Sequence, residues 1–339
     1  MIVQPKSEKV AMTHNHDTGG FRLFRLLKFA PYLLLAALAL VFAAINPAVL
    51  SLPNTLNIVS QATPIAILAV GAMVVLISGG IDLSAAYGVA FCSTLIASRI
   101  DAGNGLPMAL LIGLVVMLMI GFVNGALVAF ARIPPFVATL ASMIALQGAT
   151  LAVAQKGVLI VKEPTLRWIG IARTDGIPNA IFVTAIVMFV AGFMMKRTRF
   201  GLRCYAIGSD QDASELAGVP IPRQFLTVYV VSAIFVFMTA VLMISRVPVV
   251  TPNVGGISLL LDAIAAAVLG GTSVFGGRGT VGGVIAGALI VSLVTTALRV
   301  FGTDPSSVEL WKGVIIILAL FGDTLIARAR ERSIARAAA

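Results

Sequence analysis

The sequence predicts an all-α polytopic membrane protein with about ten transmembrane helices and both termini in the cytoplasm. Hydrophobic residues make up 59% of the 339 residues and charged residues only 11%, whereas a soluble domain is about one quarter charged. Apolar runs recur along the whole chain, and short basic clusters separate them. So few charged side chains could not cover the surface of a soluble protein of this length, so the lipid bilayer is the expected surrounding.

Because a helix needs about 20 apolar residues to cross a bilayer, the apolar runs can be assigned one by one. The expected spans are residues 29–46, 57–78, 84–98, 107–131, 136–155, 179–195, 225–245, 257–273, 280–301 and 310–327. The third and the eighth are short and interrupted. The division is a cytoplasmic tail over 1–28, one transmembrane domain over 29–327 that includes a cytoplasmic loop at 196–224, and a basic cytoplasmic tail over 328–339. No small-residue cleavage site follows the first run, which favours an uncleaved span over a secretory signal.

The distribution of basic residues supports an inside N-terminus. With that orientation, 16 of the 24 Lys and Arg residues lie in cytoplasmic segments, as the positive-inside rule requires. The other eight are Arg99, Lys156, Lys162, Arg167, Arg173, Arg246, Arg299 and Lys312. The net charge of +10 therefore reflects topology, and we expect no nucleic-acid partner, since the charges form no single patch.

The sequence does not indicate a catalytic, metal or cofactor site. Cys92 and Cys204 lie in different environments, and the two histidines fall in the N-terminal tail, so no metal or cofactor site is expected. The sequence contains no set of nucleophile, base and orienting residue at a spacing recognisable from known catalytic sites. The chain has no Gly-Lys pair and hence no Walker A loop. Any ATP would have to be hydrolysed by another polypeptide.

The cytoplasmic loop contains one short helix signal, "SDQDASELAGVP". Ser209 or Asp210 can cap its start, Gly218 suits a left-handed end, and Pro220 blocks continuation. Acidic Asp212 lies in the first turn, where the helix dipole favours it. Two turns are not stable alone in water, so a partner is expected to hold this helix. Its acidic centre favours a protein groove over a lipid surface. The small apolar face comprises Ala213, Leu216 and Ala217.

The glycine-rich run "GGTSVFGGRGTVGGVIAGALI" covers residues 270–290. Its G-x-G-x-x-G match is rejected as a dinucleotide motif, because membrane spans flank it on both sides. Gly279, Gly283 and Gly287 recur every four residues and predict one face of a span on which another helix packs closely. The preceding glycines predict irregular backbone beside a polar cavity.

Asp82 in "SGGIDLS" and Asp262 in "LLLDAIAA" are the notable ionisable residues at membrane depth. A carboxylate there is costly, so each is expected to face a cavity or a partner. For Asp82 a capping role at the third span is favoured. The segments "ISGGIDLSAA" and "VGGISLLLDAIA" also resemble each other faintly, as an inverted repeat would, although chance similarity is favoured.

Four stretches together resemble a known family: "SGGIDLS", "GFVNGALVAFARIPPFVATLASM", "TRFGLRCYAIGSDQDASELAGV" and "LDAIAAAVLGGTSVFGGRGTVGGVIAGALI". They are similar to the permeases of bacterial ABC sugar importers, the ribose, xylose, arabinose and galactose group, over about residues 57–325. The resemblance implies a transmembrane subunit in the inner membrane that moves a monosaccharide by alternating access. It also implies a cytoplasmic ATPase subunit, a periplasmic solute-binding protein and a second permease copy, identical or related.

The resemblance also implies roles for particular residues. The cytoplasmic helix would be the coupling helix that docks on the ATPase: Ala206, Gly208, Ala213 and Gly218 match the family pattern, whereas Asp210 replaces Asn and Ser214 replaces Ala. Family members often read Tyr-Glu-Leu-Asp where this chain has residues 259–262, and Asn-Gly-Leu at 296–298. The implied sets are as follows: the coupling helix, Gly208, Ser209, Asp210, Asp212, Ala213, Leu216, Ala217 and Gly218; the pathway or gate, Asp82, Asp262, Gly270, Gly271, Thr272 and Thr296; and binding-protein docking, Lys162, Arg167, Arg173 and Arg246.

Three alternatives remain open at this point. A related permease could carry a branched-chain amino acid, a nucleoside or a furanose-like signalling molecule. An ion-coupled carrier would need a cation or proton site in its pathway and would leave the coupling helix unexplained. A membrane scaffold or enzyme would have neither an ATPase partner nor solute flux. The residues do not say which solute is carried.

Overall fold

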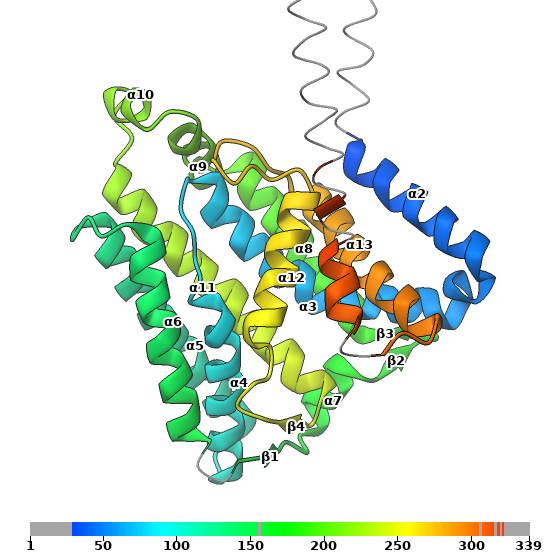
Figure 1. The fold of residues 1–339 in the computed structure, drawn as a ribbon. Helices are drawn as coiled ribbons and strands as arrows, with labels where there is room; N and C mark the ends of the chain where they lie inside the picture. Colours follow the sequence, from blue (N-terminus) through cyan, green and yellow to red (C-terminus); the bar gives the residue numbers. More distant parts are fainter. Residues whose placement is uncertain (1–28, 155–156, 305–306, 315–316, 319–320, 322–339) are drawn as a thin grey trace, which may run out of the picture.

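The computed structural model describes residues 29–154, 157–304, 307–314, 317–318 and 321, and Figure 1 shows them as a bundle of helices. The predicted N- and C-terminal tails and most of the tenth span lie outside these residues. The helices are α2 (Ala30–Ile45), the 3-10 turn η1 (Pro47–Leu50), α3 (Leu52–Ile77), α4 (Ala85–Asp101), α5 (Leu106–Ala129), α6 (Pro135–Val153), α7 (Pro164–Gly170), α8 (Asn179–Arg197), α9 (Arg199–Ser209), α10 (Gln211–Leu216), α11 (Ile221–Arg246), α12 (Gly256–Leu269) and α13 (Val281–Val300).

Among the described residues, six helices are long and apolar enough to cross a membrane: α3, α5, α6, α8, α11 and α13. They coincide with six of the predicted spans, so the prediction of an all-α polytopic membrane protein is confirmed in that form. The apolar helices α2 and α12 are shorter, with 16 and 14 residues. A count of about ten spans and the cytoplasmic position of both termini stay predictions.

The two ends of the bundle differ. Helices α9 and α10 lie at one end, whereas α7 and four short strands lie at the other (Figure 1). These strands were not expected from the sequence. Strand β1 (Leu159–Ile160) pairs antiparallel with β4 (Val249–Val250), and β2 (Arg173–Thr174) pairs with β3 (Ile177–Pro178). We refer to the two ends as the α10 end and the strand end.

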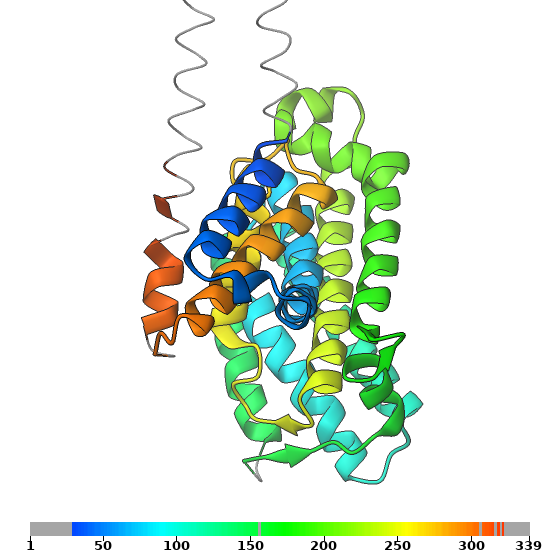
Figure 2. The ribbon, with the colours of Figure 1, turned by 90° about the vertical axis from the view of Figure 1, so that its right-hand side faces the viewer.

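Helix α3 lies inside the bundle and is buried along most of its length. Figure 2 shows α2 lying alongside α13 on one side of the bundle, with both helices oblique and with α8 and α11 upright beside them. Helices α5 and α6 instead present large apolar side chains outward, among them Met119, Phe122 and Phe136. On a soluble protein such a continuous apolar surface would be exceptional, and it fits hydrocarbon surroundings.

The third predicted span, residues 84–98, forms the continuous helix α4, and a non-helical segment precedes it. After α3 ends at Ile77, the chain turns at Gly79, whose φ of +80° is easily reached only by glycine. Residues 80–83 then run back into the bundle without helical structure, and α4 begins after Ser84. The eighth span is shorter than predicted, since α12 begins at Gly256, directly after the N-cap Gly255, and ends at Leu269; both glycines have positive φ. The two faintly similar segments of the sequence therefore each place a glycine pair at, or a few residues before, the start of a helix.

Candidate functional site

A polar cavity of about 540 Å³ opens near the strand end, between α3, α11, α12 and α13. Its uncharged polar lining comes from helices that are otherwise apolar: Asn57 and Gln61 on α3, Ser258 on α12, and Ser292 and Thr295 on α13. Its charged lining comprises Arg246, Asp262, Arg299, Glu309 and Lys312. Amide, hydroxyl and charged groups around one apolar-walled space are suited to bind a small hydroxylated solute.

An ion-paired cluster closes one side of this cavity. The Lys312 ammonium lies 2.7 Å from a carboxylate oxygen of Asp262 and 2.7 Å from one of Glu309. The Lys312 and Asp262 side chains are only 7% and 15% exposed, so this pair is largely withdrawn from water. Asp262 thus has the partner that a carboxylate at membrane depth needs. The pair also fixes the segment that carries Lys312 against α12.

Arg246 approaches the cavity from α11. Its guanidinium donates hydrogen bonds to the carbonyl oxygen of Ser60 and, at 3.4 Å, to the hydroxyl of Thr63. Pro64 lies inside α3 and has no N–H, so the Ser60 carbonyl receives no helical hydrogen bond from position 64. The proline therefore frees an acceptor, and Arg246 uses it to join α11 to α3.

A second polar cluster lies inside the bundle, around Asp82. The hydroxyls of Ser84 and Ser232 donate to its two carboxylate oxygens at 2.5 and 2.9 Å. The Ser84 N–H also donates, at 3.0 Å, so Asp82 supports the start of α4 from two residues before the N-cap. The sequence favoured Asp82 as the N-cap itself, and this is wrong: Ser84 occupies that position, and the carboxylate binds its N–H and hydroxyl instead. Ser232 lies about 16 Å along α11 from its first residue, which places the carboxylate well inside the bundle.

Neighbouring helices hold the segment that carries Asp82. The Asn124 amide of α5 donates to the Ser84 hydroxyl at 2.9 Å. The hydroxyls of Thr139 on α6 and Tyr229 on α11 both donate to the carbonyl oxygen of Ile81. The non-helical backbone is thereby supplied with hydrogen bonds, which is the condition for irregular backbone at membrane depth. The cluster does not line the polar cavity.

At the α10 end, the loop forms two helices rather than one. Ser209 is the last residue of α9, and Asp210 caps α10 by accepting a hydrogen bond from the Ala213 N–H at 2.9 Å. Gly218 follows with φ of +80°, as its position after the helix predicts. Ser214 points inward and is buried, whereas Leu216 is 91% exposed. An apolar side chain so exposed on a capped helix is a candidate contact for another protein.

Helix α9 holds α10 against the bundle. A side chain at Gly208 would overlap the carbonyl oxygen of Ile77, the last residue of α3, so only glycine allows this approach. The same carbonyl accepts a hydrogen bond from the Gly277 N–H at 2.9 Å. Tyr205 donates to the carbonyl oxygen of Gly279 at 2.8 Å. Helix α9 therefore contacts both the end of α3 and the glycine-rich loop before α13.

The observed structure of the glycine-rich run differs from two of its predictions. Gly283 and Gly287 do pack against the backbone of α12, at Gly270 and Ala266. Gly279, however, precedes α13, which begins at Val281 after the cap Thr280, and it lies against the Ile77 side chain instead. The irregular segment of residues 270–277 was expected to border a polar cavity. It packs against α9 instead.

Among the implied pathway residues, only Asp262 lines the polar cavity. Gly270 packs against α13, Gly271 lies near Pro31, and Thr272 and Thr296 are buried with hydroxyls that have no hydrogen-bond partner in the described part of the chain. Asn57, Gln61 and Ser292 were missed in the sequence. Their signal was weak: polar residues within apolar runs, with Asn57 and Gln61 one helical turn apart.

The four basic residues assigned to docking separate into two groups. Lys162, Arg167 and Arg173 are exposed at the strand end, where Lys162 and Arg167 flank a shallow hollow beside Trp168 of α7. Arg246 is turned inward and lines the polar cavity, so it does not belong to the exposed rim. Its assignment by sequence failed because a basic residue at a span end cannot be told from one that turns into the bundle.

A polar cavity among apolar helices, together with an exposed capped helix at the opposite end, defines a membrane permease subunit. The chain belongs to the branched-chain amino acid transport system / permease component family, whose pattern it matches over residues 54–321.

Three relatives illustrate the range of that similarity. The ribose import permease of Haemophilus influenzae is 31% identical, over 92% of this chain and 98% of its own length. The fructose import permease of Rhizobium meliloti is 32% identical, over 79% and 77%. The galactofuranose transporter permease of Escherichia coli is 30% identical, over 79% and 78%. No solved structure matches the chain.

Proposed function

We propose that the chain is the transmembrane subunit of an ATP-binding cassette importer that moves a monosaccharide across the bacterial inner membrane. Relatives named for ribose, fructose and galactofuranose support a sugar. The polar cavity supports it independently, because its amides, hydroxyls and charged groups offer donors and acceptors to several solute hydroxyls.

The observation that carries the proposal is the position of α3. One end of α3, at Asn57 and Gln61, lines the polar cavity, and the other end, at Ile77, touches Gly208 of α9. A force applied to α9 and α10 therefore reaches the cavity through one buried helix. A packed helix of this kind can transmit a conformational change between the site where energy enters and the site where solute binds.

In this mechanism, a separate ATPase subunit docks on α10 and on the exposed Leu216 side chain. Closure of a pair of ATPase subunits on ATP would push the coupling helices of two permease copies. A solute-binding protein would deliver the sugar at the strand end, where Lys162, Arg167 and Arg173 present positive charge that guides encounter. The ten spans and two cytoplasmic termini belong to this proposal.

Co-purification with the ATPase tests it. The tagged chain is co-expressed with its ATPase subunit and isolated in mild detergent, as wild type, Leu216→Asp and Leu216→Met. Wild type and Leu216→Met should retain the ATPase, whereas Leu216→Asp should lose it, because only the aspartate removes the apolar contact. Loss from both variants, or from neither, would contradict docking through α10.

Solute uptake with the cognate binding protein then separates the substrate classes. Ribose, fructose and galactose are compared with leucine and adenosine as radiolabelled solutes. Uptake of a sugar supports the proposal. Uptake of leucine alone would instead follow the description of the matched family and would overturn the assignment to sugars.

A further inference from the structure

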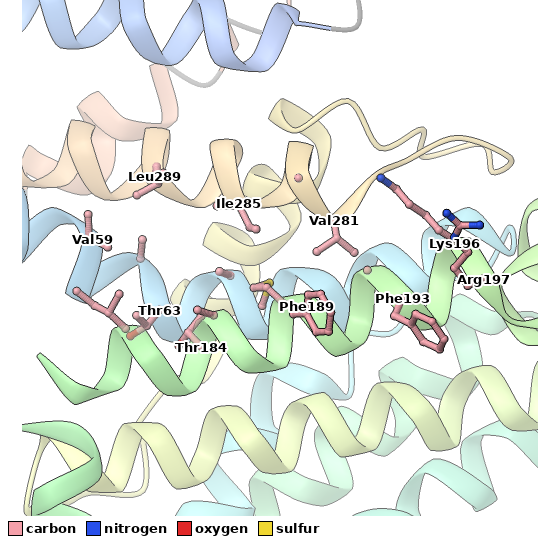
Figure 3. Close-up of a pocket in the computed structure, with 17 residues that line it drawn as sticks. Val59, Thr63, Thr184, Phe189, Phe193, Lys196, Arg197, Val281, Ile285 and Leu289 are labelled. Atoms are coloured by element: carbon pink, nitrogen blue, oxygen red, sulfur yellow. The ribbon is translucent and has the colours of Figure 1, made fainter.

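A second cavity, separate from the polar one, runs along the side of the bundle between α3, α8 and α13 (Figure 3). Its volume is about 640 Å³, and we call it the lateral groove. Small residues leave it open: Ala62 and Ala66 on α3, Ala185 and Gly192 on α8, and Gly282 on α13. The walls are apolar, with Phe189 and Phe193 on the α8 side. None of these residues has a role in the proposed transport mechanism.

One end of the lateral groove is charged. Lys196 and Arg197, in the last turn of α8, line this end, and Figure 3 shows both beyond the apolar walls. Both side chains are exposed, and neither forms an ion pair with an acidic residue within the described ranges. Basic residues at a helix C-terminus interact favourably with its dipole, but that effect does not explain the groove below them.

The groove is long enough to cross the hydrocarbon core of one bilayer leaflet. From Ile181 to Arg197 the lining residues of α8 extend about 24 Å along the helix axis. Half of a hydrocarbon core about 30 Å thick is about 15 Å. With the basic pair at headgroup level, the apolar part therefore reaches at least to the middle of the membrane. An occupant with a long apolar chain and an anionic head would match both parts.

We propose that the lateral groove binds an acyl chain of an anionic phospholipid, whose phosphate is held by Lys196 and Arg197. A second copy of this chain is the other candidate occupant. In a two-fold interface the same surface meets itself, and the groove lining contains no acidic side chain that could pair with the two cations. Anionic lipids of the cytoplasmic leaflet would supply that missing charge.

Native mass spectrometry of the purified, delipidated full chain tests the site. The protein is titrated with phosphatidylglycerol and with phosphatidylcholine of identical acyl chains, and separately with glycerol phosphate and inorganic phosphate. Phosphatidylglycerol should bind more tightly than phosphatidylcholine. The double variant Lys196→Ala/Arg197→Ala should weaken phosphatidylglycerol about thirtyfold, at about fivefold for each basic residue, and leave phosphatidylcholine unchanged.

A second variant tests the groove itself. A Cβ atom at Gly192 would meet no other atom within 4 Å, so Gly192→Leu should fold normally and extend into the groove. It should weaken both lipids. Two controls match these changes: Gly148→Leu, where the space beside α6 is equally open, and Arg223→Ala/Arg278→Ala, which removes two exposed charges outside the groove. Both should bind lipid as wild type does.

Three results would overturn the proposal. Equal phosphatidylglycerol affinity for wild type and Lys196→Ala/Arg197→Ala would show that the basic pair holds no phosphate. Dissociation of a dimer by Gly192→Leu, with lipid binding unaltered, would show that a second copy occupies the groove. Glycerol phosphate binding as tightly as the lipid would assign the basic pair to free phosphate.

Discussion

Arg246 of α11 donates to the carbonyl oxygen of Ser60 in α3, an acceptor that Pro64 leaves without its helical donor. The pair joins two helices whose residues are 186 positions apart in the sequence. It lies beside the polar cavity, to which both Pro64 and Arg246 contribute lining. The proline therefore determines where the arginine is held, and the arginine in turn determines the charge that the cavity presents.

Replacing the arginine should cost both stability and transport. In Arg246→Ala the Ser60 carbonyl loses a charged donor, and a loss of about 1 to 3 kcal/mol in unfolding free energy is expected. Thermal unfolding in detergent measures the first effect and sugar uptake the second. Pro64→Ala is the informative companion, because its new N–H can satisfy Ser60 and should release Arg246. It should reduce uptake without the same loss of stability; unaltered uptake in both variants would argue against this role.

Removing one partner of the Lys312–Asp262 ion pair should lower the free energy of unfolding more than removing both partners. Lys312→Met leaves a largely buried carboxylate unpaired, and such a change costs about 3 to 5 kcal/mol. Lys312→Met/Asp262→Asn should recover most of that loss. Unfolding free energies of both single variants and the double variant give the coupling. Additive effects would contradict a direct interaction, because independent sites add.

Local features could be predicted from the sequence, and the cavity could not. The cap at Asp210 and the left-handed Gly218 depend on residues within one or two turns, so a short stretch contains the whole signal. The cavity brings Asn57, Asp262 and Lys312 together from three distant parts of the chain. In the sequence each is one polar residue in or beside an apolar run, and nothing local indicates that they converge.

The difference between local signals and long-range contacts also explains why Gly279 was wrongly predicted to share a helical face with Gly283 and Gly287. A spacing of four residues predicts a common helical face only where the helix extends, and Thr280 caps α13 just after Gly279. Contacts with neighbouring helices decide where α13 begins, and the spacing of residues in the sequence does not reveal those contacts. The family resemblance supplied the predictions of a coupling helix and of partner proteins, and of the pathway residues that it implied, only Asp262 lines the cavity.

The contact between Gly208 and Ile77 should be needed for coupling. Gly208→Ala would place a methyl group on the Ile77 carbonyl, so α9 must move away from the end of α3. Overpacking of this kind costs about 1 to 3 kcal/mol. ATPase activity of the assembled complex should then persist while uptake falls. Gly148→Ala, in open space, is the control and should leave both activities unchanged. Equal uptake by Gly208→Ala and wild type would contradict transmission through this contact.

The Cys204 thiol reports whether α9 stays docked. It is buried on α9 beside the Gln224 amide, 3.2 Å away, and burial raises the pKa of this thiol. Since the thiolate is the reactive form, maleimide should label the folded protein slowly at pH 8. A raised pKa also means that this group favours the folded state below the ordinary thiol pKa, and that the contribution is lost as pH rises towards the folded pKa.

Labelling should therefore accelerate when α9 detaches. In a Cys92→Ala background, which leaves one thiol, Gly208→Ala should label faster than the parent protein at pH 8. Binding of the ATPase subunit should slow labelling, because it presses the loop against the bundle. Mass spectrometry over a time course gives both rates, with Gly148→Ala as the control. Rapid labelling of the parent protein at pH 8 would mean that α9 is not held by Ile77 and the glycine-rich loop.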